Sequence, residues 1–284
     1  MSRLDQIDEF ESLFRRSERE RFVFADVPIE SVAMVTGDES PEAIRASLSG
    51  FLPRIGESTT WHTIGNDQFG SVAELLQRVD AQQVDLLVTR RHLQEAHLSP
   101  QHSLGVYLDE LTQRTSIPVL VLPGTSRTPR PLPEISCRRV MVVADHISGD
   151  HRLVNYGVRM CSEGGSVWLC HVEDDMVLRR YIAAIEQIPE IASDPAASRL
   201  EEQLLNEATQ FIETCFEVLR ETGPNMSLKS HVGMGHHVTE YRRLIDEHEM
   251  DLLVSNTKDD DQLAMHGMTY SLSVELTDIP MLLL

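Results

Sequence analysis

The stretch HGMTYSLSVELTDIPMLLL, His266 to Leu284, decides the fold because the chain contains a second copy of its pattern. Leu104 to Leu122 is LGVYLDELTQRTSIPVLVL, and in both copies a glycine stands thirteen residues before a proline. A helix-like pattern lies between the glycine and the proline, and an apolar run follows the proline. Each copy therefore predicts a helix followed by a buried strand.

The similarity between the two copies extends upstream, to a segment that itself aligns without gaps. Val72–Val88 aligns with Val238–Val254, and the aligned segments share identical residues that include the aspartates Asp85 and Asp251. Both segments end in Asp-Leu-Leu-Val, the kind of apolar run that forms a buried parallel strand. Because the period is well over a hundred residues, the repeat indicates a duplicated domain rather than a solenoid of short units.

Length and charge narrow the classes of protein to which the chain can belong. With 284 residues, of which 41% are hydrophobic, the sequence is long enough for a buried core in each of two domains. The formal net charge of −20 disfavours binding to nucleic acid or to anionic membranes, because both require a cationic patch. Neither an apolar run of about 18 residues nor a signal peptide stands out. We therefore expect a cytoplasmic protein that does not insert into membranes.

The repeat and a proline-rich segment predict the domain boundaries. Apolar residues at helical spacing predict an N-terminal helix at 1–22, which could pack on its own domain or on another protein. The first domain is predicted at 23–123 and the second at 135–284, with an acidic insertion at 173–198. Between them, a linker is predicted at 124–134. The segment PGTSRTPRPLP, at 123–133, contains four prolines, which favour an extended conformation.

Within each domain, predicted strands alternate with predicted helices. Strands are expected at 31–36, 59–64, 85–89, 119–122, 139–144, 166–172, 227–232, 251–255 and 281–284. Helices are expected at 41–55, 72–82, 105–114, 150–163, 196–221, 238–248 and 268–277, with a short helical piece at 177–188. This alternation favours a doubly wound α/β sheet in each half.

Cysteine and histidine patterns provide no strong redox or metal motif. The four cysteines lie in the second half without a CxxC pair, so we expect buried free thiols: Cys137, Cys161, Cys170 and Cys215. His236 and His237, with His171 and an aspartate run, could form a metal site or a pH sensor. Because no HxxxH or HExxH pair is present, exposed loop histidines are the favoured interpretation and we assign no metal ligand.

The second half resembles the universal stress protein family. Its first strand ends in Val143-Ala144-Asp145 and its second in His171-Val172; Asp-Leu-Leu-Val and the glycine–proline spacing follow. The resemblance covers about 137–284 and, less completely, 59–123. It implies an α/β fold of two tandem doubly wound parallel-sheet domains, of the adenine nucleotide alpha-hydrolase-like type, with the first domain shortened. Since family members pair through their last strand, it also implies an internal pseudo-dimer, and a homodimer is a further option.

Many members of this family bind ATP, and the resemblance implies where a nucleotide would lie. Their motif is a glycine, two residues, a second glycine, nine residues and a third glycine followed by serine. The glycines let the backbone approach phosphates, and the N-terminus of the following helix holds the anion. In the second half, the resemblance places a nucleotide against six residues: Val143, Asp145, Val172, Asn256, Gly267 and Met268.

The sequence departs from this motif in both halves. Gly267 is followed by Met268 rather than serine, and the twelve residues before Gly267 contain no glycine. Three aspartates at 259–261 stand where the phosphates would lie and would repel a polyanion. In the first half Gly105 is followed by Val106, again without the upstream glycines. ATP binding is therefore not expected in the first half, and it is an alternative in the second.

These departures favour a regulatory or binding protein of the universal stress protein type, without catalytic activity, that acts through protein–protein contacts. The partner could be a membrane transporter or a signalling protein, and the insertion at 173–198 is the candidate contact surface because it is larger than the family requires. One alternative is a sensor that binds ATP or AMP in the second half. A weak nucleotide hydrolase or a metal-dependent enzyme is least favoured, because GxSxG, P-loop and CxxC motifs are absent. We therefore assign no catalytic residue and no cofactor.

Overall fold

The computed structural model describes residues 21–37, 39–56, 58–95, 103–144, 147–185, 193–222, 224–257, 265 and 267–284. The helix predicted at 1–22 lies almost wholly outside these residues. Asp145 and the aspartates at 259–261 also lie outside them, so the predictions that concern these residues stay predictions.

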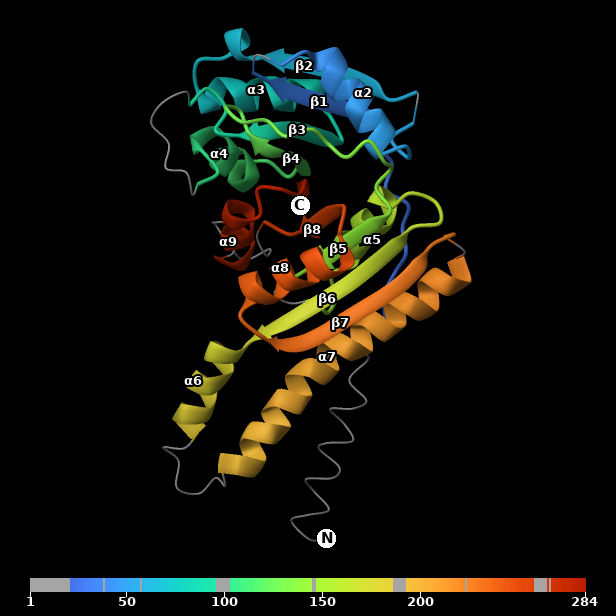
Figure 1. Cartoon of the computed structure of the whole chain (residues 1–284), viewed down its shortest axis with the longest axis vertical. Helices are drawn as coiled ribbons and strands as arrows, with labels where there is room; N and C mark the ends of the chain where they lie inside the picture. The colour runs from blue at the N-terminus through green and yellow to red at the C-terminus, as the bar shows by residue number, and fades with distance from the viewer. Residues whose placement is uncertain are drawn as a thin grey trace.

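Within the described residues, nine strands form one continuous sheet in the order β2-β1-β3-β4-β9-β8-β5-β6-β7 (Figure 1). Neighbouring strands run parallel except at the junction of β4 with β9, where they are antiparallel. The strands are β1 (Ser31–Thr36), β2 (Thr60–Gly65), β3 (Leu86–Arg91), β4 (Val119–Thr125), β5 (Arg139–Val143), β6 (Ser166–Asp174), β7 (Ser227–Gly235), β8 (Leu252–Ser255) and β9 (Met281–Leu283). The predicted α/β class with parallel sheets is therefore confirmed.

The two halves share one strand order, but the first half is shorter. In the second half the strands lie in the order β7-β6-β5-β8-β9. The chain adds β6 and β7 on one side of β5 and then returns to add β8 and β9 on the other side, so the reversal point lies between β5 and β8. In the first half the order is β2-β1-β3-β4, with the corresponding change of side between β1 and β3, and its described residues contain one strand and one helical connection between strands fewer than the second half. The predicted shortening of the first half therefore corresponds to one strand–helix unit, and each half keeps its own reversal point.

Helices cover both faces of the sheet. They are α2 (Pro41–Phe51), α3 (Val72–Gln82), α4 (Val106–Arg114), α5 (His151–Met160), α6 (Asp175–Ile185), α7 (Ser193–Thr222), α8 (His237–His248) and α9 (Gly267–Glu275). Buried side chains of α2, α5 and α7 belong to one apolar cluster, and those of α3, α4, α8 and α9 belong to another. Each cluster runs through both halves, so the sheet is sandwiched between two continuous apolar layers.

Four strands extend two or three residues further than their sequence patterns indicate: β3, which continues to Arg91, and β4, β6 and β7. β4 continues to Thr125, into the linker predicted at 124–134, because Arg91 pairs with Thr125 beyond a register shift. β6 and β7 pair with each other as far as Asp174 and Gly235. The predicted insertion at 173–198 consequently contains the end of β6, all of α6 and the start of α7. Polar strand ends carry little alternation, which is why the pattern places these boundaries too early.

The aspartates shared by the two repeats have the same structural role in both. The N–H of Asp85 donates to the carbonyl of Ser31 at 2.9 Å, and that of Asp251 donates to the carbonyl of Arg139 at 2.8 Å. In return, each carboxylate accepts the backbone N–H of that residue and of the residue before it, at 2.8–2.9 Å. The aspartate therefore fixes the start of the central strand in each half, β1 or β5.

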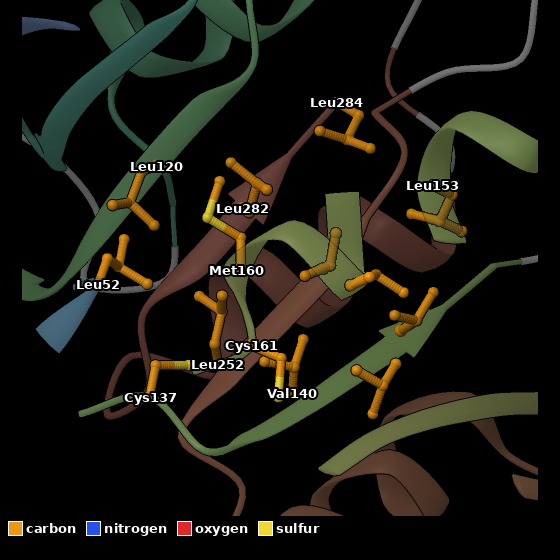
Figure 2. Packing of buried hydrophobic residues seen from close by; sticks show 14 of the residues in the cluster. Leu52, Leu120, Cys137, Val140, Leu153, Met160, Cys161, Leu252, Leu282 and Leu284 are labelled. Carbon is orange, nitrogen blue, oxygen red and sulfur yellow. The ribbon is translucent and has the colours of Figure 1, made fainter. Parts of the chain in front are cut away.

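The antiparallel pair β4–β9 joins the two halves into one sheet. Val119 pairs with Leu283 and Val121 with Met281, and all four side chains are buried. Figure 2 shows Leu120 and Leu52 of the first half facing Leu282 of the second, within a single packed cluster. The interface is therefore continuous with the protein interior.

Arg91 is a buried cation that connects the halves. It lies at the end of β3 and is 1% exposed. Its guanidinium donates from Nε to the carbonyl of Ser273 at 3.0 Å and from Nη2 to the carbonyl of Leu276 at 3.1 Å, at the C-terminal end of α9. Nη1 donates to the carbonyl of Leu122 on β4 at 3.4 Å. A cation at a helix C-terminus is favoured by the helix dipole, so Arg91 both caps α9 and joins it to the first half.

The residues that precede β1 cross onto the second half. Phe22 is buried in the cluster beside α7, and its N–H donates to the hydroxyl of Thr214 at 3.1 Å. The side-chain amide of Asn155, on α5, accepts from the N–H of Ala25 and donates to the carbonyl of Val23, each at 3.2 Å. This segment is a second connection between the halves.

The four cysteines are buried and free, as predicted. Burial raises the pKa of Cys161, Cys170 and Cys215 to about 12, and it raises the pKa of Cys137 well above its usual value. Because the thiolate is the reactive form, these side chains act as small apolar core residues. Among the described residues, no helix is long and apolar enough to cross a membrane.

Candidate functional site

Each half has a reversal point in its strand order, and ligands of open α/β sheets bind at the carboxyl ends of the strands beside such a point. In the second half this edge lies at the ends of β5, β6 and β8. The structure brings Val143 and Asn256 to this edge, because Val143 ends β5 and Asn256 directly follows β8. Val172 lies near the end of β6, and the start of α9 reaches the edge through Thr269, whose hydroxyl lies 2.9 Å from that of Ser255. The structure thus places these predicted site residues near one another at one edge of the second half, and their role in binding a nucleotide stays a prediction.

Two side chains of α8 form hydrogen bonds with the backbone N–H and carbonyl of Val172. The N–H of Val172 donates to the hydroxyl of Tyr241 at 3.1 Å, and its carbonyl accepts from Nε2 of His237 at 2.7 Å. The two rings stack on each other, with centroids 6.1 Å apart and an interplanar angle of 10°. Tyr241 is fully buried, so it is fixed in this position. Both groups that an adenine could use at Val172 are therefore already hydrogen-bonded.

Asn256 is tied to the neighbouring loop rather than turned outward. Its side-chain amide donates to the carboxylate of Asp150, which also caps α5 by accepting the N–H of Leu153 at 2.9 Å. The backbone carbonyl of Asn256 accepts from the hydroxyl of Thr269 at 2.7 Å, and that hydroxyl lies 2.9 Å from the hydroxyl of Ser255. The polar groups at this edge hence satisfy one another.

The glycine shared by the repeats is required by sterics in the first copy only. Gly105 has a φ of +85°, and a Cβ there would lie 2.8 Å from the Cα of His92. A Cβ at Gly267 would meet no atom within 4 Å among the described residues. Met268, the residue after Gly267, is buried and packs in the core. The start of α9 is thus a site of apolar packing.

Two of the histidines singled out in the sequence are not exposed loop residues, so that interpretation is wrong for them. His171 is buried on β6, with Nε2 at 2.9 Å from the carboxylate of Glu173 and Nδ1 at 3.4 Å from the carbonyl of Ala144. His237 is half-buried against Val172, and only His236 is exposed. In the described ranges, no group of three or more histidine, cysteine or acidic side chains is arranged to hold a metal ion.

In the first half, a carboxylate of the chain itself caps the helix that would hold a phosphate. The backbone N–H of Val106, at the start of α4, donates to the carboxylate of Glu95. The other carboxylate oxygen lies 3.4 Å from Nδ1 of His92. His92 and Gln94 adopt left-handed backbone conformations, with φ of 57° and 58°, which fold this loop back onto α4. A helix N-terminus favours an anion, and here Glu95 supplies it.

The first half also contains a cleft that the sequence did not predict. It has a volume of about 750 Å³ and is lined at the carboxyl ends of all four strands, by residues that include Val35, Asn66, Arg90, Glu95 and Arg127. Arg90 is buried there and donates from Nε to Glu39 at 2.7 Å. We refer to this hollow as the first-half cleft. The only sequence signal for it is the pair of arginines that follows the apolar strand Leu86–Thr89.

A hydrogen-bonded aromatic residue borders the loop that caps α4. The hydroxyl of Tyr107 donates to Oε1 of Gln94 at 2.8 Å, and Nε2 of Gln94 donates to the carbonyls of Asn66 and Phe69 at 2.7 and 3.0 Å. Burial, followed by the carboxylates of Glu74 and Glu95, raises the pKa of Tyr107. The phenol is therefore protonated near neutral pH and acts as a fixed donor.

Comparisons with known proteins find similar solved structures of low sequence identity. No protein-family model and no curated protein matches the sequence. The chain is similar to a solved universal stress protein from Archaeoglobus fulgidus DSM 4304, with 13% identity, coverage of 90% of this chain and 85% of that chain, and a TM-score of 0.49. It is also similar to a protein from Pseudomonas aeruginosa UCBPP-PA14 named for the same family, with 14% identity, coverage of 90% and 93%, and a TM-score of 0.48. The fold of this chain is defined by its own strand order.

Proposed function

We propose that the chain is a cytoplasmic regulatory protein of the universal stress protein type that acts by binding another protein, without catalysis and without a bound nucleotide. One observation carries the proposal: both backbone groups of Val172 are hydrogen-bonded to side chains of the chain itself. In the first half, Glu95 occupies the corresponding helix N-terminus. A nucleotide would have to displace these groups before it could bind.

The energetic cost of that displacement supports the proposal. Tyr241 is fully buried, and a buried hydroxyl that loses its partner costs about 1–3 kcal/mol. His237 would have to leave the carbonyl of Val172 as well. At α4, a polyphosphate would meet the carboxylate of Glu95 instead of free N–H groups. These unfavourable terms weaken the binding of any nucleotide.

A sensor that binds ATP or AMP in the second half is the alternative. It is favoured by the complete five-strand order of that half, with the reversal point between β5 and β8. It requires α8 to release Val172, so binding would change the surface of α8. This coupling would connect nucleotide binding to partner affinity.

Calorimetric titration of the purified protein with ATP, ADP and AMP, with and without Mg²⁺, separates the two candidates. We expect no binding tighter than about 1 mM for any of them, a binding free energy weaker than about 4 kcal/mol. Micromolar affinity that is lost in Asp145→Ala would overturn the proposal in favour of the sensor. The variant His237→Ala with Tyr241→Phe is informative as well, because it frees Val172 while leaving the strand order intact.

We further propose that α6 and the start of α7 form the surface that contacts the protein partner, here called the helical arm (175–185 and 193–207). Figure 1 shows these helices projecting beyond the ends of β6 and β7. Met176 and Tyr181 on α6 are 61% and 54% exposed. Exposed methionine and tyrosine are residue types enriched at protein interfaces. A membrane transporter, a signalling protein or a second copy of the chain are partners compatible with the proposal.

Removing these two side chains should weaken partner binding without affecting folding. The double variant Met176→Ser/Tyr181→Ser is expected to reduce recovery of the partner in affinity purification by about tenfold or more, since few residues dominate an interface. The matched control is Ile135→Ser, which removes a comparably exposed apolar side chain, 55% exposed, outside the arm. Equal recovery from the double variant, the control and the wild type would exclude the helical arm as the contact surface.

A further inference from the structure

We propose that the first-half cleft binds a small zwitterionic molecule of amino-acid size, which carries one carboxylate and one protonated amine. The cleft lies where the strand order of the first half reverses, between β1 and β3. Its volume of about 750 Å³ falls within the usual range for small-molecule sites, about 300–1,000 Å³. The proposal is independent of the partner-binding function proposed above.

Two arginines provide the side of the cleft that would bind a carboxylate. Arg127 lines the cleft, is exposed, and has no ion pair or hydrogen bond within the described part of the chain. Arg90 lies buried beneath, held by Glu39 through Nε and by the carbonyls of Pro123 and Arg130 through Nη1. Arg90 therefore adds a positive charge to the cleft lining, while Arg127 keeps its whole guanidinium for a ligand. Planar guanidinium groups bind carboxylates through paired hydrogen bonds.

Acceptors in the lining of the same cleft would bind the amine. Oδ1 of Asn66 is buried and has no hydrogen-bond partner among the described residues. Buried polar atoms are nearly always hydrogen-bonded, so this oxygen indicates a missing donor. The carboxylates of Glu39 and Glu95 line the same cleft and would stabilise a positive charge. A protonated amine supplies both the donor and the charge.

The lining excludes a nucleotide and favours a molecule with both signs of charge. Glu39 and Glu95 together balance the charges of Arg90 and Arg127, so the cleft has no excess of positive charge for a polyphosphate. Glu95 already caps α4, which removes the usual anchor of a phosphate. A molecule with no net charge but one positive and one negative group can pair with residues of both signs in the cleft.

The test is a thermal-shift and calorimetric screen of the full chain with the twenty standard amino acids at millimolar concentration. For each amino acid that binds, the matched probes are its decarboxylated amine and its N-acetyl derivative, which lack one of the two charges. We expect at least one amino acid to bind, and both matched probes to bind about tenfold more weakly or not at all. ATP and AMP serve as the nucleotide comparison.

Variants assign the binding to the cleft. Arg127→Gln, at an exposed position, should weaken the bound amino acid about tenfold or more, and Asn66→Leu should do the same. The control Arg78→Gln removes an exposed arginine on α3, outside the cleft lining, and should bind like the wild type. The proposal is overturned if no amino acid binds, if Arg127→Gln binds unchanged, or if only the nucleotides bind.

Discussion

Replacing Arg91 with methionine is expected to lower the free energy of unfolding by about 3 kcal/mol. Methionine approximates the aliphatic part of the side chain, but it leaves the carbonyls of Ser273, Leu276 and Leu122 without their donor. Each buried acceptor that loses a partner costs about 1–3 kcal/mol, and removal of a buried charge offsets part of the total. Burial lowers the pKa of Arg91 to about 10, so the side chain is still a cation at neutral pH.

Chemical denaturation measures this loss, with Arg114→Met as the control. Arg114 forms an exposed ion pair with Glu110 at 3.1 Å, and such pairs contribute about 0–1 kcal/mol. Arg91→Lys should lie between the wild type and Arg91→Met, because a single ammonium cannot reach all three carbonyls. If Arg91→Met is as stable as the wild type, Arg91 does not join the halves in the way described here.

Replacing Asp251 with alanine is expected to destabilise the protein by about 3–4 kcal/mol, and the equivalent change Asp85→Ala by about 2 kcal/mol. Both variants leave two backbone N–H groups without an acceptor at the start of a central strand. Asp251 is more buried and also accepts from Nη2 of Arg139 at 3.0 Å, whereas Asp85 has no recorded arginine partner within the described residues. The difference between the halves follows from that burial and from the added ion pair.

The second aspartate pair shared by the repeats provides the matched control. Asp80 and Asp246 are exposed on α3 and α8, so their replacement by alanine should change stability by less than about 0.5 kcal/mol. Unfolding curves of all four single variants test the prediction. A loss at Asp246 equal to that at Asp251 would show that the carboxylate contacts to strand starts are not what the repeat preserves.

Much of the fold could be predicted because the repeat contains its strongest patterns. The helices Val72–Gln82 and Val106–Arg114 follow local periodicity and caps, and the structure places them within one residue of the predicted bounds. The pairing of β4 with β9 agrees with what the family resemblance implies, contact between the last strands of the two halves, but no local pattern indicates it. The loss of one strand–helix unit in the first half is likewise a matter of tertiary structure. No local pattern distinguishes an absent unit from a short one.

The candidate sites were only partly predictable, for a similar reason. The sequence predicts that Val172 and Asn256 lie at one edge of the sheet, but it does not indicate the side chains of α8 that occupy this edge, since Tyr241 lies 69 residues from Val172. Arg90 and Arg91 follow the predicted strand and look like the start of a polar loop. Their burial depends on carbonyls as far as 185 positions away, such as that of Leu276. Composition does not indicate which charged residue will find such partners.

The junction of β4 with β9 has a consequence for synthesis of the protein on the ribosome. β4 emerges with the first half, but the strand that covers its edge is β9, which follows β5, β6, β7 and β8 along the chain. In the interval, Val119, Leu120 and Val121 form an uncovered apolar edge, the kind of surface that pairs with other nascent chains. A growing chain therefore passes through a stage in which this edge is open to pairing with other chains, until β9 covers it.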